Sequence, residues 1–167
     1  MSRAFVKEPD GDQVDDEIPE RPQSEHPNYI TRQGLDALQQ RIQDLYRKKQ
    51  DLEATGEEIA ARDQIKRIER DLRYYQARQD RAIPVDTSAQ RGEDIRFGAT
   101  VTVRDEDDRQ LRFTIVGEDE ADVASGRISW VSPLARALLG RRIGDTVSWP
   151  RPAGDVELEI EDFSYGP

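Results

Sequence analysis

The chain has 167 residues, of which 36% are charged and only 7% aromatic, so a compact domain joined to an extended helical element is expected rather than one large core. Its formal net charge of −10 at pH 7 argues against sequence-specific or general DNA binding, because contacts to phosphate need a basic surface. The absence of cysteine excludes disulfides and thiolate metal sites, and a single histidine argues against a zinc site.

Residues 1–28 combine eight acids, three bases and four prolines with few large apolar side chains. Such a segment cannot bury enough apolar surface to offset its ordering entropy, so it is predicted to be a disordered acidic tail. It has no signal-peptide core, and no later run is long enough to span a bilayer, so we expect a soluble cytoplasmic protein without a membrane partner.

Residues 29–83 show the spacing of two amphipathic helices. Thr31 is a plausible N-cap, and apolar residues then recur at alternating steps of three and four. The spacing predicts an antiparallel coiled-coil hairpin that turns near Gly56 and ends before Pro84. The seam of this hairpin is expected to contain Leu35, Leu38, Ile42, Leu45, Lys49 and Leu52 on the first arm, and Ala61, Ile65, Ile68, Leu72, Tyr75, Gln79 and Ala82 on the second.

Charge is unevenly distributed along the predicted hairpin. Its tip carries the acids Asp51, Glu53, Glu57 and Glu58. Behind the tip lies a basic shaft made of Arg47, Lys48, Lys49, Lys66, Arg67, Arg70 and Arg73. The hairpin has twelve bases and ten acids, whereas the preceding tail has a net charge of −5. This contrast motivates the hypothesis that the tail masks the shaft.

Residues 84–94 are predicted to form a polar linker, and residues 95–167 a small α+β domain. Period-two alternation predicts strands at residues 100–103, 111–116, 127–131, 146–149 and 156–160. Asp105 to Asp108 form an acidic turn between the first two strands. Ser132 is the expected N-cap and Pro133 the first residue of the one helix, which ends at Gly140. We expect a twisted antiparallel sheet with this helix across it.

The run from Ile128 to Gly140, Ile-Ser-Trp-Val-Ser-Pro-Leu-Ala-Arg-Ala-Leu-Leu-Gly, resembles the C-terminal domain of the Gre (GreA/GreB) transcript-cleavage factors. Residues 96–101 and 115–122 add to the resemblance. It implies an FKBP-like domain that docks on the secondary-channel rim of bacterial RNA polymerase, in a monomeric elongation factor. The docking residues that it implies are Asp119, Glu120, Asp122, Ser129, Ser132, Pro133 and Arg136.

The same resemblance assigns roles to the two charged parts of the hairpin. The tip acids Asp51, Glu53, Glu57 and Glu58 would assist a polymerase-bound Mg²⁺, and the basic shaft would face the nascent RNA 3′ end. The protein would then have no cofactor and no active site of its own, because the polymerase would cleave the RNA.

The hairpin departs from the family pattern at its tip. The family tip reads approximately Gly-Asp-Leu-(Ser or Lys)-Glu-Asn-Ala-(Glu or Asp)-Tyr, whereas residues 51–58 read Asp-Leu-Glu-Ala-Thr-Gly-Glu-Glu. Each arm is also shorter by about one heptad, which withdraws the tip by about 10 Å. The tip acids therefore match the family by position and chemistry rather than by motif, and stimulation of cleavage and passive occupation of the channel both stay open.

Two other functional classes are considered. The short hairpin fits a regulator of the kind represented by the nucleoside diphosphate kinase regulator, although its arms still exceed three heptads. An FKBP-like domain could also be a prolyl isomerase, which needs an apolar pocket lined by aromatic side chains. The available aromatic side chains are more simply assigned to a core, and they are Phe97, Phe113, Trp130, Trp149, Phe163 and Tyr165.

Overall fold

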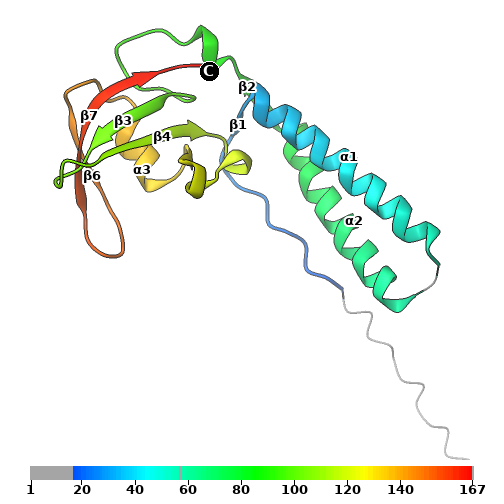
Figure 1. The fold of residues 1–167 in the computed structure, drawn as a ribbon. Coiled ribbons are helices and arrows are strands. Elements are labelled where there is room, and N and C mark those ends of the chain that lie inside the picture. Colours follow the sequence, from blue (N-terminus) through cyan, green and yellow to red (C-terminus); the bar gives the residue numbers. More distant parts are fainter. Residues whose placement is uncertain (1–16, 57, 167) are drawn as a thin grey trace, which may run out of the picture.

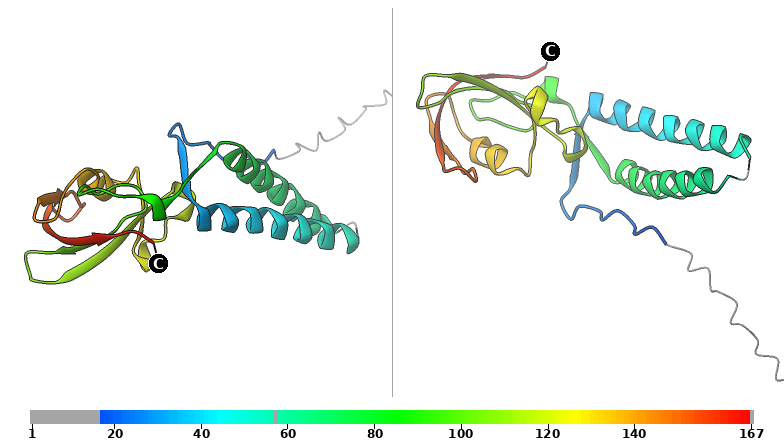
Figure 2. Two further views of the ribbon diagram at one scale, coloured as in Figure 1. Left: turned by 90° about the horizontal axis from the view of Figure 1, so that it is seen from above. Right: turned by 60° about the horizontal axis from the view of Figure 1, so that its bottom comes forward.

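The computed structural model describes residues 17–56 and 58–166, which form a helical hairpin and a sheet domain at its root (Figure 1). Helix α1 spans Arg32–Ala54 and α2 spans Ile59–Asp80, and the two lie side by side in every view (Figure 2). The predicted hairpin is confirmed. Two short parallel strands at its root were not predicted: β1 (Asn28–Thr31) leads into α1 and pairs with β2 (Ala82–Val85), which follows α2.

The hairpin forms along the expected seam. Leu38 and Ile42 of α1 are buried against Ile68 and Leu72 of α2. The one charged member of the seam, Lys49, crosses to the opposite arm, where its Nζ lies 2.8 Å from a carboxylate oxygen of Glu69. The α-helical spacing of apolar residues therefore decides the packing, and the one lysine is accommodated by an ion pair between the arms.

The sheet domain consists of five strands, and four of them lie where the alternation predicts within two residues. Strand β7 (Val156–Ser164) is longer than predicted, and the others are β3 (Thr100–Arg104), β4 (Gln110–Val116), β5 (Arg127–Ser129) and β6 (Thr146–Trp149). The strand order is β5-β4-β3-β7-β6. The prediction of a wholly antiparallel sheet is wrong at one edge, because β5 pairs with β4 in parallel. The chain between them crosses over through two 3₁₀ turns, η2 (Glu118–Glu120) and η3 (Val123–Ser125), as a parallel pair requires.

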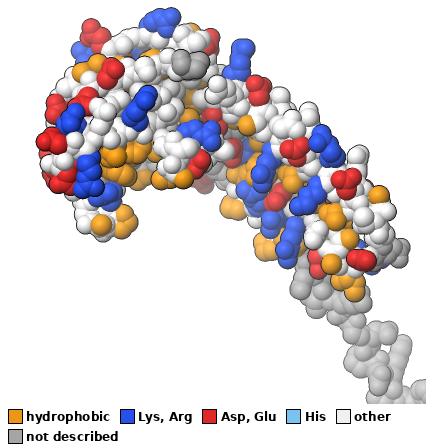
Figure 3. Space-filling model, in the orientation of Figure 1, with side chains coloured by type: hydrophobic (Ala, Val, Ile, Leu, Met, Phe, Trp, Pro, Cys, Tyr) orange, Lys and Arg blue, Asp and Glu red, His pale blue; other side chains and the backbone are white. Residues whose placement is uncertain are grey.

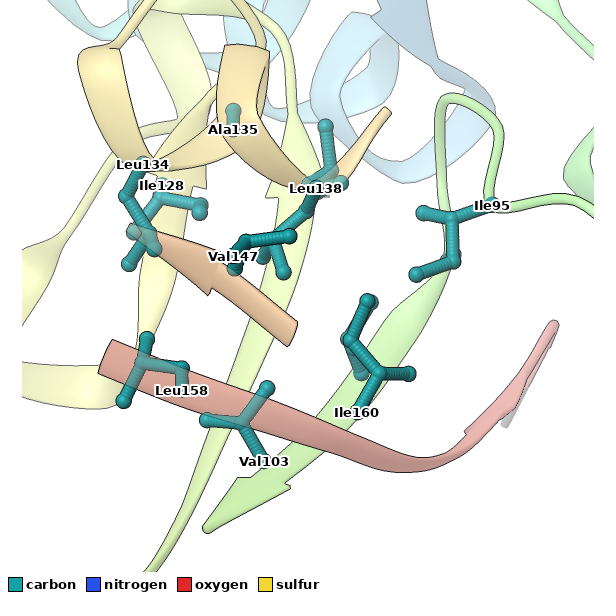
Figure 4. Close-up of a cluster of buried hydrophobic side chains, with 12 residues drawn as sticks. Ile95, Val103, Ile128, Leu134, Ala135, Leu138, Val147, Leu158 and Ile160 are labelled. Atoms are coloured by element: carbon teal, nitrogen blue, oxygen red, sulfur yellow. The ribbon is translucent and has the colours of Figure 1, made fainter. Parts of the chain in front are cut away.

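Helix α3 (Pro133–Leu138) covers this sheet as predicted (Figure 4). The Ser132 hydroxyl accepts a hydrogen bond from Ala135 N at 3.3 Å and so caps the helix. Leu134 and Leu138 are buried among Ile128, Val147, Leu158 and other core residues. The six aromatic residues named above are partly buried and pack around this core, in agreement with their expected role.

Two boundaries differ from the sequence-based prediction. Residues 84 and 85 belong to β2, and Thr87–Ala89 forms the 3₁₀ turn η1, so the predicted linker is largely structured. The expected disorder is also wrong for residues 17–28, which lie along α2 and reach the sheet domain, while residues 1–16 lie outside the described residues. This segment has little apolar surface to bury, and ion pairs and cation–π contacts hold it against α2 instead. No helix within the described ranges is both long and apolar enough to cross a membrane.

Candidate functional site on the hairpin and its root

The tip of the hairpin presents its acids to solvent. Asp51, Glu53 and Glu58 are exposed there, and Glu57 lies outside the described residues. The Glu53 carboxylate forms an ion pair with Lys49, whose Nζ lies 3.7 Å away. Within residues 17–56 and 58–166, no three side chains of the types that ligate metals gather closely enough to hold an ion. The carboxylate oxygens of Asp51, Glu53 and Glu58 are therefore accessible from solvent.

The basic shaft is partly assembled along the hairpin, where Lys and Arg side chains gather (Figure 3). Arg47, Lys48 and Arg67 are exposed, whereas Arg70 lies 2.9 Å from its neighbour Asp71. Lys49 is only 26% exposed because it pairs with Glu69 in the seam. The predicted shaft therefore contains exposed cations, an arginine paired with its neighbour on α2, and one lysine that joins the two arms.

Residues 17–27, here called the strap, cover part of this shaft. The Glu20 carboxylate accepts two hydrogen bonds from the Arg73 guanidinium, at 2.5 and 3.1 Å. The Arg21 guanidinium lies over the Tyr74 ring, 3.9 Å from its centroid. Further along, Gln23 donates to the Tyr74 carbonyl at 3.3 Å. The strap therefore follows α2 through a series of polar contacts (Figures 1 and 2).

The contact between Glu20 and Arg73 predicts a pH dependence of the strap. The hydrogen bond from Arg73 lowers the pKa of Glu20 from its ordinary value of 4.5. Because its pKa is lowered, the ionised Glu20 carboxylate stabilises the contact between the strap and α2 above pH 4.5. This stabilisation is lost as the pH falls through the lowered pKa. We expect α2 to hold the strap more firmly at neutral pH than in acid. A titration of the Glu20 carboxyl by ¹³C NMR checks this, and in Arg73→Ala the pKa of Glu20 should rise; an unchanged pKa would contradict the contact.

At the hairpin root, a buried arginine joins three elements. The Arg78 side chain is 1% exposed, and its Nε donates to the Asp119 carboxylate of η2 at 2.7 Å. Its Nη2 donates to the Asn28 side chain of β1 at 2.6 Å and lies 3.5 Å from Glu118. Asn28 in turn donates to the Arg78 carbonyl at 2.7 Å. A buried charge is stable only when it is paired and hydrogen-bonded. Nε and Nη2 of Arg78 meet that condition, whereas Nη1 has no hydrogen-bond partner among the described residues.

A second contact ties the start of α1 to the same turn. The Glu120 carboxylate accepts hydrogen bonds from the Thr31 N–H at 3.0 Å, from the Gly117 N–H at 2.9 Å and from the Thr31 hydroxyl. That hydroxyl accepts from Gly34 N at 3.0 Å as the N-cap of α1. Gly34 has no room for a side chain, since a Cβ there would lie 2.1 Å from the Glu120 Cδ. Together with Arg78, Glu120 fixes the hairpin on the sheet domain.

The residues expected to dock the polymerase therefore fall into two groups. The carboxylates of Asp119 and Glu120 are engaged at the hairpin root, a use that the sequence did not suggest. Of the other expected residues, Ser129, Ser132, Pro133 and Arg136 lie in or just before α3, and Asp122 precedes η3. Ser132 caps α3, the Ser129 hydroxyl accepts from Val131 N at 3.3 Å, and the Ser125 hydroxyl donates to the Asp122 carboxylate. Pro133 and Arg136 are exposed.

Three contributors to the root were missed by the sequence analysis, namely Asn28, Gly34 and Arg78. Their partners lie 40 to 86 positions away along the chain, and no local motif marks those pairs. A glycine in the first turn of a strongly patterned helix was the one available signal, because glycine there is unfavourable unless a close approach requires it. His26, expected in a solvated tail, lies against Trp130 with ring centroids 5.9 Å apart.

Residues 90–165 match a family model described as the C-terminal domain of the transcription elongation factors GreA and GreB. Transcription elongation factor GreA of Sphingopyxis alaskensis is 40% identical over 115 residues, which cover 69% of this chain and 73% of that protein. Transcription elongation factor GreB of Neisseria meningitidis serogroup B is 34% identical over 157 residues, covering 85% and 96%. The solved structure of GreA/GreB from Nitrosomonas europaea aligns at 22% identity and a TM-score of 0.41, covering 84% of this chain and 99% of that chain.

Proposed function

Because this chain belongs to the GreA/GreB family of transcription elongation factors, we propose that it binds bacterial RNA polymerase as a cytoplasmic monomer and inserts its hairpin into the secondary channel. The observation that carries the proposal is an exposed acidic tip on a long, partly basic hairpin, held at its root against the matching domain. A hairpin of this kind can bring carboxylates to a recessed site, while a separate surface of the protein binds the rim of the channel.

The docking surface is assigned to the region around the start of α3, with Asp122, Ser129, Ser132, Pro133 and Arg136. Asp122, Pro133 and Arg136 are the exposed members, so they are the side chains that a partner would meet first. Asp119 and Glu120 contribute by fixing the angle of the hairpin, since their carboxylates face Arg78 and Thr31.

The tip would act on the polymerase's own chemistry. A Mg²⁺ ion held by the polymerase stabilises developing negative charge and activates water. Asp51, Glu53 and Glu58 lie at the free end of the hairpin, where their oxygens are accessible as additional ligands. The exposed cations Arg47, Lys48 and Arg67 suit the phosphates of a displaced RNA 3′ end. The protein itself would have neither an active site nor a bound cofactor.

A second candidate is a regulator that occupies the channel without promoting cleavage. The alignment with the Neisseria GreB spans 157 positions but only 85% of this chain, which is about 142 residues, so about 15 positions of that relative face a gap. A loss of this size supports the shortening by about one heptad per arm. With 23 residues, α1 reaches about 35 Å from its root.

The test is RNA cleavage in stalled, backtracked polymerase complexes, measured with and without the protein beside a binding titration. For a stimulating factor, we expect faster cleavage that falls by at least about 10- to 100-fold in Glu57→Ala/Glu58→Ala, since even groups that only orient a metal's ligands contribute that much. The control Glu106→Ala/Asp155→Ala removes the same charge from the sheet domain and should keep the activity. Binding without faster cleavage would favour the channel-occupying regulator, and absence of binding would contradict both functions.

A further inference from the structure

We propose that the strap occupies a binding face for single-stranded RNA on α2, so that the strap and RNA compete for the same side chains. The inference rests on the proposed function, in which the shaft faces RNA, and adds a regulatory segment of this chain to it. The competing contacts are those of Glu20 with Arg73 and of Arg21 with Tyr74.

The covered face has the chemistry of a single-strand site. A cleft of about 440 Å³ lies between the strap and α2 and is lined by Glu17, Ile18, Pro19, Glu20, Lys66, Glu69 and Arg73. Directly after Arg73 on α2, the rings of Tyr74 and Tyr75 lie edge to face, with centroids 5.2 Å apart. Cationic side chains that follow a phosphate backbone, beside aromatic rings on which bases stack, are the common means of holding single strands.

Two side chains of the strap occupy the positions that a phosphate and a base of a nucleotide would take on this face. The Glu20 carboxylate meets the Arg73 guanidinium through two hydrogen bonds, as a phosphate would. The planar Arg21 guanidinium lies on the Tyr74 ring, at the position that a stacked base would take. The anionic Glu20 and the planar Arg21 are neighbours in the chain, just as a phosphate and a base are neighbours in a nucleic-acid strand.

The strap is also held weakly enough to be displaced. Arg73 and Glu20 are 56% and 61% exposed, and ion pairs between exposed side chains contribute little because solvent screens them. Two acids share the face, but both keep a partner on the hairpin after the strap leaves: Asp71 is paired with Arg70, and Glu69 with Lys49. A strand that offers several phosphates would therefore meet a surface whose own acids are already neutralised.

The experiment measures binding of a fluorescent oligouridylate to the full chain by anisotropy, at low and at physiological salt. Glu20→Gln should tighten binding two- to fivefold, the factor that corresponds to one exposed ion pair. The matched control is Glu25→Gln, which makes the same charge change on an exposed strap residue. Its affinity should stay within the small change that net charge alone produces, and both affinities should weaken as salt rises.

Arg73→Ala completes the test, because it removes the group over which strap and RNA compete. It should weaken RNA binding, and in its presence Glu20→Gln should no longer change the affinity. Equal effects of Glu20→Gln and Glu25→Gln, tightening that persists without Arg73, or no RNA binding by any variant would overturn the inference. If Glu20→Gln tightens only polymerase binding, the strap covers a protein contact and the RNA assignment is wrong. Polymerase binding and cleavage are measured separately, so the proposed function stands or falls independently.

Discussion

Replacement of Arg78 by alanine is expected to lower the free energy of unfolding by about 3 kcal/mol, because it leaves acids of η2 without their buried partner. Removing one member of a buried ion pair costs about 3–5 kcal/mol. Asp119 and Glu118 keep 14% and 22% exposure of their side chains, so water compensates part of the loss and the lower end of that range applies. The variant should also leave the Asn28 Oδ1 without its guanidinium donor, while Asn28 keeps its hydrogen bond to the backbone carbonyl of residue 78.

Urea unfolding of Arg78→Ala measures this effect. Arg67→Ala is the matched control, because Arg67 lies on the same helix but is exposed, and its change should stay within about 0.5 kcal/mol. Arg78→Lys keeps the charge but not the planar fork that reaches two partners, so we expect an intermediate loss. Equal stability of the Arg78 and Arg67 variants would mean that the network does not hold the root.

Gly34→Ala is expected to destabilise the protein by about 2–4 kcal/mol, although alanine favours a helix over glycine by about 1 kcal/mol. The new Cβ would lie 2.1 Å from Cδ and 2.4 Å from Cγ of Glu120. Glu120 would have to leave, and its hydrogen bonds to Thr31 and Gly117 would be lost. Hydrogen bonds to a charged group contribute about 1.5–3 kcal/mol each, so their loss outweighs the gain in helix propensity.

A double-mutant cycle separates this clash from other effects of the substitution. In a Glu120→Ala background, the side chain that opposes the new Cβ is gone. There Gly34→Ala should be neutral or should stabilise the protein by up to about 1 kcal/mol, as at an ordinary helical position. Thermal or urea unfolding of the four proteins gives the coupling. If Gly34→Ala costs the same in both backgrounds, the close approach of Glu120 is not the cause.

The sequence predicts best where one periodic pattern decides the structure. The steps of three and four from Leu35 onward locate the hairpin, and alternation locates the strands from Thr100 to Ile160. The cap at Ser132 was also predictable, because its chemistry is local. In each case the side chains that decide the structure are neighbours in the sequence.

Prediction fails where distant polar groups meet. Composition indicates that residues 17–27 cannot fold alone, and this is consistent with their dependence on Arg73 and Tyr74, more than 50 positions away. Asp119 and Glu120 look like a solvated acidic loop in the sequence, whereas the fold uses their charges at the root. The parallel strand β5 was missed as such because the direction of pairing depends on the crossover and not on the strand itself.

The root network also sets the aim of the hairpin. Because α1 extends about 35 Å from Thr31, a tilt of about 3° at the root displaces the tip sideways by about 2 Å, the length of a metal–oxygen bond. The position of the tip therefore depends on a few contacts at the root of the hairpin. Substitutions at Arg78 or Glu120 would leave the tip acids chemically unchanged but would broaden the range of positions that they occupy. A loss of function caused by such a substitution would therefore arise from misplaced tip acids.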